Sequence, residues 1–253
     1  QREFAAMMPY AQLAKHVDRP RQKIVYEMDD AFTKLPVWHV SYEHYRTIGR
    51  FITEYIKSAD LVTVSTEQLK TYYEHLNSNI VVIPNSLDLQ LWGGFAQYDT
   101  APSPVRILFS GTLTHAGDLR MVEDVIETVL TEFGDKVTFL FWGNTSDRLR
   151  RYPQVKVLAE FTPDYAAYAA IVRSTPVDFA LIPLQDNAFN EAKSHIKWIE
   201  YSACKIPGVY SSVGEYRTSI KDGVTGMLVE NTADAWHQAI KRFIVDEPFR
   251  KTI

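Results

Sequence analysis

The sequence has a single cysteine, Cys204, among its 253 residues. One cysteine excludes an internal disulfide bond and any metal site that needs several cysteine ligands. No apolar run approaches the roughly 18 residues that predict a membrane-spanning helix, and no signal-peptide pattern opens the chain. We therefore expect a cytoplasmic location, with peripheral contact to a membrane left open. Cys204 lies on the apolar side of a predicted helix, which indicates a buried thiol rather than a nucleophile.

An excess of charge of one sign is also missing, since 27 basic residues stand against 31 acidic ones and the net charge is −4. This balance gives no general attraction to nucleic acid or to an anionic membrane. Internal repeats and low-complexity tracts are absent from the sequence. Hydrophobic residues make up 46% of the chain, as in ordinary soluble proteins, and the length suits two modest domains or one large domain.

Apolar runs and helical patterns alternate along the first part of the chain. The patterns predict a helix at 1–21, strands at 24–28, 61–65 and 80–83, a helix at 41–58, and another helix that begins after the N-cap Thr66. The order strand, helix, strand predicts parallel pairing in an α/β layer. Because this part shows only three strands, fewer than such sheets usually contain, we expect the first domain to be incomplete.

Residues 93–104 are rich in glycine, proline and small polar residues, which predicts a linker between domains. After it the alternation restarts and predicts a Rossmann-like domain with five or six parallel strands. We divide the chain into an N-terminal Rossmann-like domain, 1–98, and a C-terminal one, 99–253. The second domain has predicted strands at 105–110, 137–142, 155–158, 177–184, 208–211 and 226–229, and predicted helices at 118–132, 164–173, 194–205 and 232–245.

The stretch 189–207 has the features of an anion-binding helix. Ser194 is a suitable N-cap, so the free amides of the first turn, that of Ile196 included, would point towards the preceding loop. A helix start of this kind attracts anions through its amides and its dipole. Lys193 and Lys197 add two cations, so the segment suits a diphosphate.

Glu200 lies about two turns further along and would suit the diol of a ribose, which together with a diphosphate outlines a nucleotide-sugar site. The alternative is an ordinary amphipathic helix whose solvated face pairs Lys197 with Glu200. In either case the apolar spacing predicts a core-facing stripe, formed by Ile196, Ile199 and Ala203.

Two segments carry a resemblance to a known family, IEYSACKIP at 199–207 and KDGVTGMLVEN at 221–231. They resemble the donor-site helix and the following turn of GT-B glycosyltransferases, in particular the retaining glycosyltransferase family four, with its phrases E-A-x-A-x-G-x-P and D-G-x-T-G-x-L-V. The resemblance implies an α/β fold of two Rossmann-like domains that face each other across a cleft. It places the acceptor on the first domain and the nucleotide-sugar donor on the second, with Glu200 as the ribose ligand.

The segment GTLTHAGD at 111–118 follows the first strand of the second domain, where ligands of open α/β sheets bind. Gly111 permits a close backbone approach, and the Thr112 hydroxyl can donate to a phosphate. His115 is either a site residue or a capping or surface histidine, and Asp118 is predicted to be the N-cap of its helix. The family's usual Arg and Lys are missing here, and the variant resembles a subgroup from polysaccharide gene clusters and phage genomes. The resemblance implies that Lys193 and Lys197 take over the phosphate contacts.

The family's first glutamate would fall at position 192, which is alanine here, so its contact with the transferred sugar passes to Glu191 or to Asn187 and Asn190. Asp29 and Asp30 end the first predicted strand and crowd two carboxylates together. The resemblance, to a phrase V-V-Y-D-x-D-D, implies that they contact the acceptor or the transferred sugar. The alternative is a solvated loop.

These observations predict a glycosyltransferase that moves a sugar from a nucleotide-diphosphate donor to a hydroxyl acceptor, with retention implied by the resemblance. The resemblance also implies that no metal and no separate cofactor is needed, since amides and basic side chains stabilise the departing diphosphate. The acceptor could be a carbohydrate, a lipid-linked sugar, or another hydroxyl compound, with nucleic acid only as a phage-type acceptor. Two alternatives stay open, a nucleotide-sugar epimerase on the same fold and a non-catalytic binding or structural protein.

Overall fold

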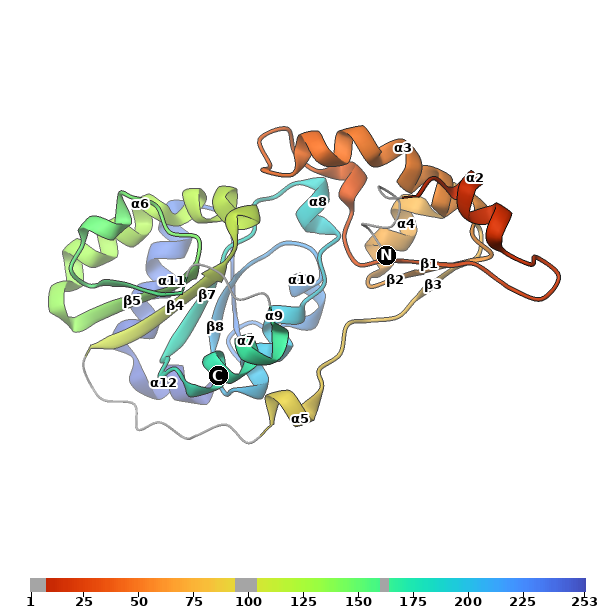
Figure 1. Cartoon of the computed structure of the whole chain (residues 1–253). Helices are drawn as coiled ribbons and strands as arrows, with labels where there is room; N and C mark the ends of the chain where they lie inside the picture. The colour runs from red at the N-terminus through yellow and green to blue at the C-terminus, as the bar shows by residue number, and fades with distance from the viewer. Residues whose placement is uncertain (1–7, 94–103, 160–163) are drawn as a thin grey trace. The chain divides into compact units, whose positions relative to one another are not determined.

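The computed structural model describes residues 8–93, 104–159 and 164–253, and the chain divides into two compact units (Figure 1). Unit 1 consists of Gln1–Asn85 and Asn187–Ser194, and unit 2 consists of Ser86–Asp186 and His195–Ile253. The predicted domain boundary after residue 98 lies in the stretch 94–103, outside the described residues.

Unit 1 is built on a parallel sheet with the order β1-β2-β3 among its described strands, as the sequence predicts. Val25 pairs with Leu61, and Val62 pairs with Ile80. The elements of this unit are β1 (Val25–Met28), β2 (Leu61–Val64), β3 (Ile80–Val82), α2 (Tyr10–Leu13), α3 (Tyr42–Ser58), α4 (Glu67–Tyr73) and α8 (Ala188–Glu191), with the 3-10 turns η1 (Ala14–His16) and η2 (Phe32–Lys34).

The long helix predicted over 1–21 is wrong for its described part. The structure has a four-residue helix, α2, after Pro9 and then a 3-10 turn that ends at His16. No side-chain cap closes the start of α2, and none of its four residues is buried. Short helices without caps or a buried face gain too little to extend further.

The core of unit 1 lies on one face of its sheet. Tyr26 and Met28 point into it from β1, and Ile52 and Tyr55 meet them from α3. On the other face, Val25 is 55% exposed and Val81 is 45% exposed. Thr66 caps α4 by accepting a hydrogen bond from the Leu69 amide at 3.1 Å, which confirms the predicted helix start.

Residues 187–194 pack with unit 1, although they are distant from it in the sequence. Phe189 and Ala192 are buried in the unit 1 core. The Phe189 ring meets the His39 ring edge-on with centroids 5.4 Å apart, and the Thr66 hydroxyl donates to the Ala192 carbonyl at 3.0 Å. These residues include a short helix, α8, where the sequence predicts a loop before the helix at 194–205.

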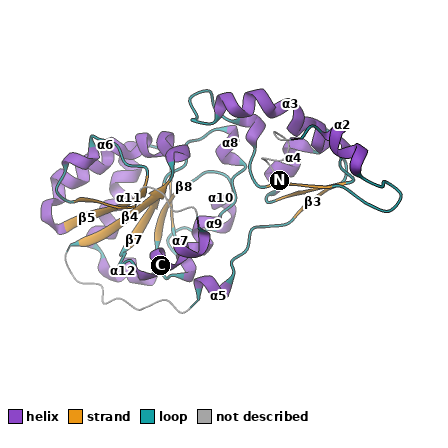
Figure 2. Cartoon of the chain, in the orientation of Figure 1, coloured by secondary structure: helices purple, strands orange, loops and turns teal. Residues whose placement is uncertain are grey.

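Unit 2 contains a six-stranded parallel sheet among its described residues, with the order β6-β5-β4-β7-β8-β9 (Figure 2). This is the order 3-2-1-4-5-6 of a Rossmann fold when its strands are counted along the chain, and it confirms the sequence prediction. The strands are β4 (Val105–Gly111), β5 (Val137–Gly143), β6 (Val155–Ala159), β7 (Phe179–Ile182), β8 (Gly208–Ser211) and β9 (Met227–Val229).

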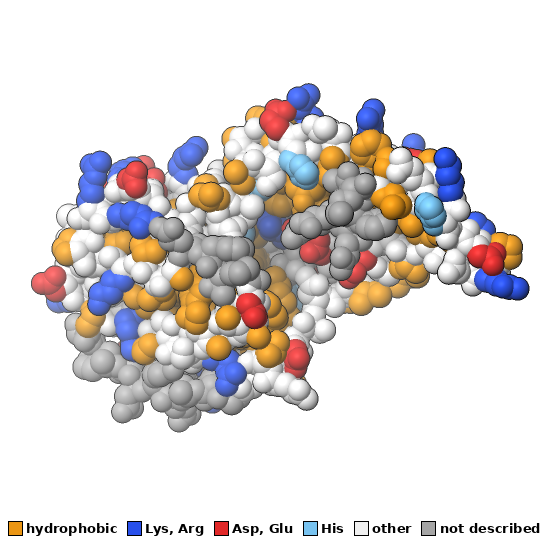
Figure 3. All heavy atoms as spheres, in the orientation of Figure 1, with side chains coloured by type: hydrophobic (Ala, Val, Ile, Leu, Met, Phe, Trp, Pro, Cys, Tyr) orange, Lys and Arg blue, Asp and Glu red, His pale blue; other side chains and the backbone are white. Residues whose placement is uncertain are grey.

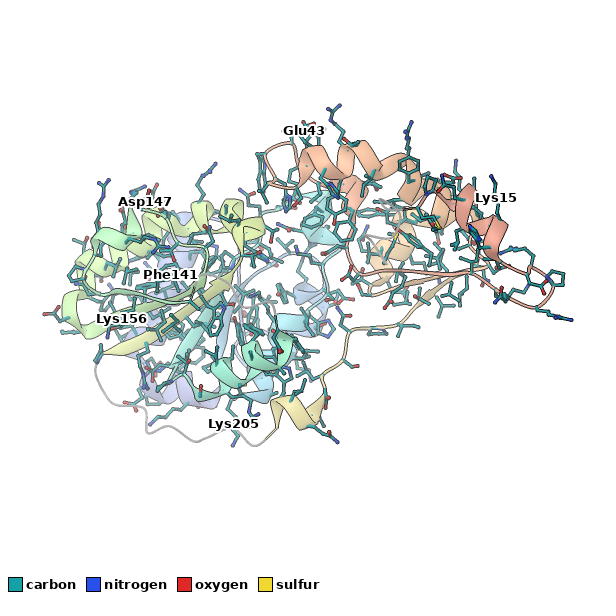
Figure 4. All side chains as sticks on the ribbon, in the orientation of Figure 1. Lys15, Glu43, Phe141, Asp147, Lys156 and Lys205 are labelled. Atoms are coloured by element: carbon teal, nitrogen blue, oxygen red, sulfur yellow. The ribbon has the colours of Figure 1, made fainter. Side chains whose placement is uncertain are left out.

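Helices cover both faces of this sheet, so β5, with the sequence VTFLFWG, is buried along its whole length. One core holds Phe141 (Figure 4), Phe139 and Phe179 together with the apolar sides of α6 and α11. The second core lies on the opposite face and includes Tyr201. The helices of unit 2 are α5 (Leu89–Trp92), α6 (Ala116–Phe133), α7 (Tyr165–Ser174), α9 (Ile196–Ala203), α10 (Tyr216–Ser219), α11 (Ala233–Val245) and α12 (Glu247–Thr252).

Candidate functional site

The strand order of unit 2 reverses between β4 and β7, which pair side by side. Chain connections leave the two strands in opposite directions at such a point, and ligands of open α/β sheets bind beyond the carboxyl ends there. In this unit those ends are Gly111 on β4 and Ile182 on β7. The loop that follows β4 and the start of α9 supply most of the predicted donor residues.

The backbone after β4 lies unusually close to the backbone after β5. The Asn144 amide donates to the Gly111 carbonyl at 2.5 Å, and Gly143 adopts a positive φ of 89°. A Cβ at position 143 would lie 2.3 Å from the Gly111 oxygen, so only glycine fits. A Cβ on Gly111 would lie 2.8 Å from the His115 Cβ. Gly111 therefore allows His115 to fold back over the strand end.

His115 is the N-cap residue of α6, and Asp118 is not the cap that the sequence predicts. Asp118 lies inside the first turn and is only 3% exposed. Its carboxylate accepts from His115 Nδ1 at 2.9 Å and from the Gln185 amide at 2.8 Å. Because Gln185 follows β7, one buried carboxylate ties together the loops after both strands of the switch point and orients the imidazole. In the same loop the Thr112 and Thr114 hydroxyls share a hydrogen bond of 2.8 Å.

The helix predicted to begin after Ser194 begins at Ile196, with His195 at the N-cap position and no side-chain cap. The Ser194 hydroxyl instead accepts from Asn85 Nδ2 at 2.7 Å, within unit 1. The Glu215 carboxylate serves the start of α9, because it accepts from His195 Nδ1 at 2.7 Å and from the His195 amide at 3.3 Å. A protein carboxylate thus binds at this helix end, as the dipole favours.

Lys197 brings its ammonium group to the end of β4. Its Nζ donates to the Ser110 carbonyl at 2.5 Å and lies 5.9 Å from the centre of the Tyr201 ring. Half-buried lysines keep the charge outward while the stem packs on apolar surface. The structure therefore places a cation beside the Gly111 loop, at the switch point.

Glu200 is 4% exposed, and its carboxylate accepts from the Tyr165 hydroxyl at 2.9 Å and from the Tyr168 hydroxyl at 3.5 Å. Burial raises the pKa of Glu200, and Lys197 and the two tyrosine hydroxyls oppose that rise. Trp92 Nε1 donates to the Tyr165 hydroxyl at 3.0 Å, which completes a polar chain through the core. A carboxylate can accept further hydrogen bonds at its remaining lone pairs, so a ribose ligand role stays a prediction.

The predicted core stripe of α9 is only partly right, because Ala203 packs against the second core of unit 2 but the fully buried residues are others. Ile196, Ile199 and Ala203 are half-buried, whereas the buried face consists of Glu200, Tyr201 and Cys204. The spacing alone could not show that α7 covers the Glu200 side of the helix with tyrosines. Cys204 is buried as predicted, and burial raises the pKa of its thiol to about 11.

The other predicted site residues belong to unit 1. Lys193 Nζ lies 3.7 Å from the Asp30 carboxylate and 4.6 Å from the centre of the Phe189 ring. Asp29 is exposed, and its carbonyl accepts from the Ser65 hydroxyl at 3.0 Å. Glu191 is half-buried at the end of α8. The structure thus brings Asp30 and Lys193 together within this unit.

The two asparagines proposed as alternatives to Glu191 have structural roles in α8. The Asn187 side-chain oxygen caps the helix by accepting from the Phe189 and Asn190 amides at 3.1 and 3.0 Å. Asn190 is 3% exposed. Asn187 and Glu191 are both half-buried, but the Asn187 side-chain oxygen is already engaged in the cap.

Sequence reasoning missed several residues of this region, and only some of them had a signal. The H-x-x-D spacing of His115 and Asp118 at a helix start is visible in the sequence and predicts a pair at i, i+3. The partners of His195 and Glu200, which are Glu215, Tyr165 and Tyr168, lie 20 to 35 residues away. No local pattern connects them.

Comparison with known proteins agrees with this geometry. The family model described as glycosyl transferases group 1 matches residues 104–246, which is more than half of the chain. The chain belongs to the glycosyl transferases group 1 family. The matched residues of this group 1 glycosyltransferase hold most of unit 2, including the switch point and α9. A search of curated protein sequences gave no match.

Solved structures similar to this group 1 glycosyltransferase confirm the predicted α/β GT-B fold. Sucrose-phosphate synthase of Thermosynechococcus elongatus is 17% identical with a TM-score of 0.66, over 90% of this chain and 59% of that one. The HepE protein of Anabaena, in complex with UDP and glucose, is 17% identical with a TM-score of 0.63, over 92% and 65%. A Rickettsia africae glycosyltransferase is 15% identical with a TM-score of 0.59, over 90% and 62%. The chain therefore spans 59 to 65% of the length of these three proteins.

The described residues contain neither a membrane-spanning helix nor a cluster of metal ligands. No helix in those ranges is long and apolar enough to cross a membrane. No group of three or more His, Cys, Asp or Glu side chains there is arranged to hold a metal ion.

Proposed function

We propose that this glycosyltransferase takes a sugar from a nucleoside diphosphate donor that binds at the switch point of unit 2, and passes it to a hydroxyl acceptor. The observation that carries the proposal is the Lys197 ammonium, fixed on the Ser110 carbonyl at the carboxyl end of β4. A cation at this edge of a Rossmann sheet suits a diphosphate. Beside it, Gly111 and Gly143 allow the ends of β4 and β5 and the His115 side chain to pack closely together.

In this proposal the group that leaves is a nucleoside diphosphate, and the protein lowers the barrier by stabilising the charge that develops on it. Lys197 supplies one positive charge, and His115, oriented by Asp118, supplies a second donor when its ring is protonated. The Thr112 hydroxyl adds a neutral donor. These groups allow the reaction to proceed without a metal ion, which is part of the proposal.

Glu200 is proposed as the ribose ligand. Its carboxylate already accepts a hydrogen bond from the Tyr165 hydroxyl, so the ribose and Tyr165 would have to share this carboxylate. Tyr165 is 45% exposed, so it lies at the surface end of the polar chain through Trp92 and can yield its place to a ribose hydroxyl. HepE of Anabaena has been solved with UDP and with UDP-glucose, which favours uracil as the base of the donor here. The base itself has no candidate contact among the residues discussed.

The finer assignments rest on the resemblance to the retaining glycosyltransferase family four. It supports retention of configuration at the transferred sugar, contact of Glu191 with that sugar, and contact of Asp29 and Asp30 with the acceptor or the transferred sugar. Lys193, Ser194 and the backbone of Ile196 are also proposed to contribute to donor binding. Lys193 Nζ lies 3.7 Å from the Asp30 carboxylate, so a bound diphosphate would share the lysine with this carboxylate.

The test compares Lys197→Ala with Lys221→Ala, which removes an exposed lysine of the same unit. Titration calorimetry with UDP-glucose and other nucleotide sugars should show binding to the wild-type protein and to the Lys221 variant. Lys197→Ala should weaken it by about 1.5–3 kcal/mol, since a charge-assisted hydrogen bond is lost. Equal affinity of the two variants would contradict the proposed donor site.

A kinetic measurement separates the proposed transfer from the alternatives. With a donor that binds, transfer requires an acceptor and releases the nucleoside diphosphate. An epimerase would instead convert the donor without an acceptor, and a binding protein would do neither. Chromatography of the nucleotide products in the presence and absence of added acceptor therefore identifies the reaction.

A further inference from the structure

A cavity lies in unit 1, and none of the residues that line it is assigned to the donor. It has a volume of about 300 Å³ and is formed by η2 and the outer side of α3. Figure 4 labels Glu43 near the start of this helix. The volume is at the lower end of the range for small-molecule pockets, which begins at about 300 Å³, so the cavity suits a group the size of one sugar.

One wall of the cavity is aromatic and rigid. Phe32 and Tyr45 stack with ring centroids 4.4 Å apart and an angle of 17° between their planes. Phe32 is 5% exposed, so the core of unit 1 holds it in place. A flat, fixed apolar wall with a hydroxyl at its edge suits the apolar face of a sugar ring.

The lining of the cavity also carries positive charge. Arg46 and Arg50 both line it and lie four residues apart on α3, which places them on the same side of the helix. Arg46 contacts the exposed carboxylate of Glu43 at 2.7 Å. An exposed pair of this kind is worth little, so an anionic ligand can compete for the guanidinium. Arginine side chains bind phosphate groups through paired hydrogen bonds. Basic side chains are visible along the surface of unit 1 in Figure 3.

Gly49 lies between the two arginines and keeps the cavity open. A Cβ built on this residue has nothing within 4 Å among the described atoms. A side chain longer than that of alanine at this position would extend into the cavity.

We propose that this cavity binds a sugar that carries a phosphate group, with the ring against Phe32 and Tyr45 and the phosphate between Arg46 and Arg50. The role of this ligand as the acceptor of the transfer rests on the proposed function. The binding site itself is argued from the geometry of unit 1 alone. A free sugar phosphate and the head group of a lipid-linked sugar phosphate share this chemistry.

The experiment uses three variants of the purified protein. Gly49→Met fills the cavity, Gly49→Ala is its matched control, and the double variant Arg46→Gln, Arg50→Gln removes the charge. Calorimetry is run with glucose 1-phosphate, glucose 6-phosphate, glucose and inorganic phosphate. We expect a sugar phosphate to bind the wild-type protein and Gly49→Ala alike, and to bind the other two variants about tenfold to a hundredfold more weakly.

The outcomes separate the parts of the proposal. Equal binding by all variants, or no sugar phosphate bound by the wild type in either the free or the lipid form, overturns it. Inorganic phosphate bound as tightly as the sugar phosphates overturns the sugar part. Vesicles of phosphatidylcholine with and without a polyprenyl phosphate sugar distinguish the sources. Binding only to vesicles with that lipid supports a lipid-linked ligand, and binding only to the free compounds supports a soluble one.

A donor titration keeps this result distinct from the proposed function. None of the cavity residues is assigned to the donor, so the Gly49 and arginine variants should bind UDP-glucose as the wild type does. Loss of sugar phosphate binding with unchanged donor binding supports the cavity. Failure of Lys197→Ala to affect the donor would contradict the donor site and leave the cavity result standing.

Discussion

The sheets of the two units differ in how their faces are covered. In unit 2 helices pack on both faces of the sheet and β5 has no exposed residue, although the edge strand β6 alternates between half-buried and exposed residues. In unit 1 one face holds the core, while Val25 and Val81 are exposed on the other. Parallel sheets are usually covered on both sides, because their strands are apolar throughout. The alternating burial of β1 in unit 1 is instead typical of a sheet with one buried face.

This difference matters for where function can be placed. A sheet covered on both faces fixes its strand ends firmly, so the loops after β4 and β7 can hold side chains in defined positions. In unit 1 Asp29 and Asp30 follow β1, while the other charged and aromatic residues assigned to a site lie on η2, on α3 and in residues 187–194. The following predictions test this contrast, beginning with the largest expected effect.

Removal of a ring from the closed core should have the largest effect. Phe179 is fully buried on β7 and its ring lies 5.0 Å from that of Phe243. Phe179→Ala should lower the free energy of unfolding by about 3–5 kcal/mol, because the cavity cannot be filled by its neighbours. Denaturant unfolding measures this loss of stability, and the variant Phe51→Ala, at a half-buried residue of unit 1, is the comparison. An equal loss for Phe51→Ala would contradict the difference between the cores.

The next prediction concerns the Asp118 carboxylate, which bonds to the loops after β4 and β7 at the switch point. Asp118→Ala leaves the Gln185 amide and His115 without their carboxylate partner, so we expect a loss of about 1.5–3 kcal/mol in unfolding free energy. The control Asp124→Ala removes an exposed carboxylate of the same helix that pairs with Arg148, and should cost less than about 1 kcal/mol. Similar losses of unfolding free energy for the two variants would show that the hydrogen bonds of Asp118 do not stabilise the loops.

A matched pair of substitutions compares the sheet faces directly. Val209 on β8 is fully buried and Val25 on β1 is 55% exposed. Val209→Thr keeps the shape and buries a hydroxyl, which should cost about 1–3 kcal/mol. Val25→Thr should change the unfolding free energy by no more than about 0.5 kcal/mol. A large loss at position 25 in thermal unfolding would mean that this face is covered in solution.

The smallest effect concerns the charge of Glu200. Because burial raises its folded pKa, the stability that the protonated group contributes is fully present below the unfolded pKa of about 4.3. It is lost as the pH rises through the raised folded pKa. Glu200→Gln keeps an acceptor for Tyr165 without the charge, so it should be more stable than the wild type at pH 7, with a smaller difference at pH 4. Unfolding curves at both values measure this, and a gain that is independent of pH would contradict it.

The sequence predicted the sheets better than the site. The strand at 137–142 and the one at 208–211 were found because continuous apolar runs bounded by polar residues are typical of buried parallel strands. The cap at Thr66 was found because its partner, the Leu69 amide, is three residues away. The N-cap of α9 was predicted at Ser194, one residue before its observed position at His195, because serine is the better capping residue of the two.

The sequence by itself determined the order of strands and helices, the parallel Rossmann pattern of unit 2 and the family, because these depend on local periodicity and on short motifs. Only the tertiary structure decided that Glu200 is buried under Tyr165, that Asp118 joins the loops after β4 and β7, and that residues 187–194 pack with unit 1. These contacts join residues 35, 67 and 126 positions apart. Side-chain spacing describes one helix or strand at a time, whereas burial and pairing of a polar group depend on which other element covers it.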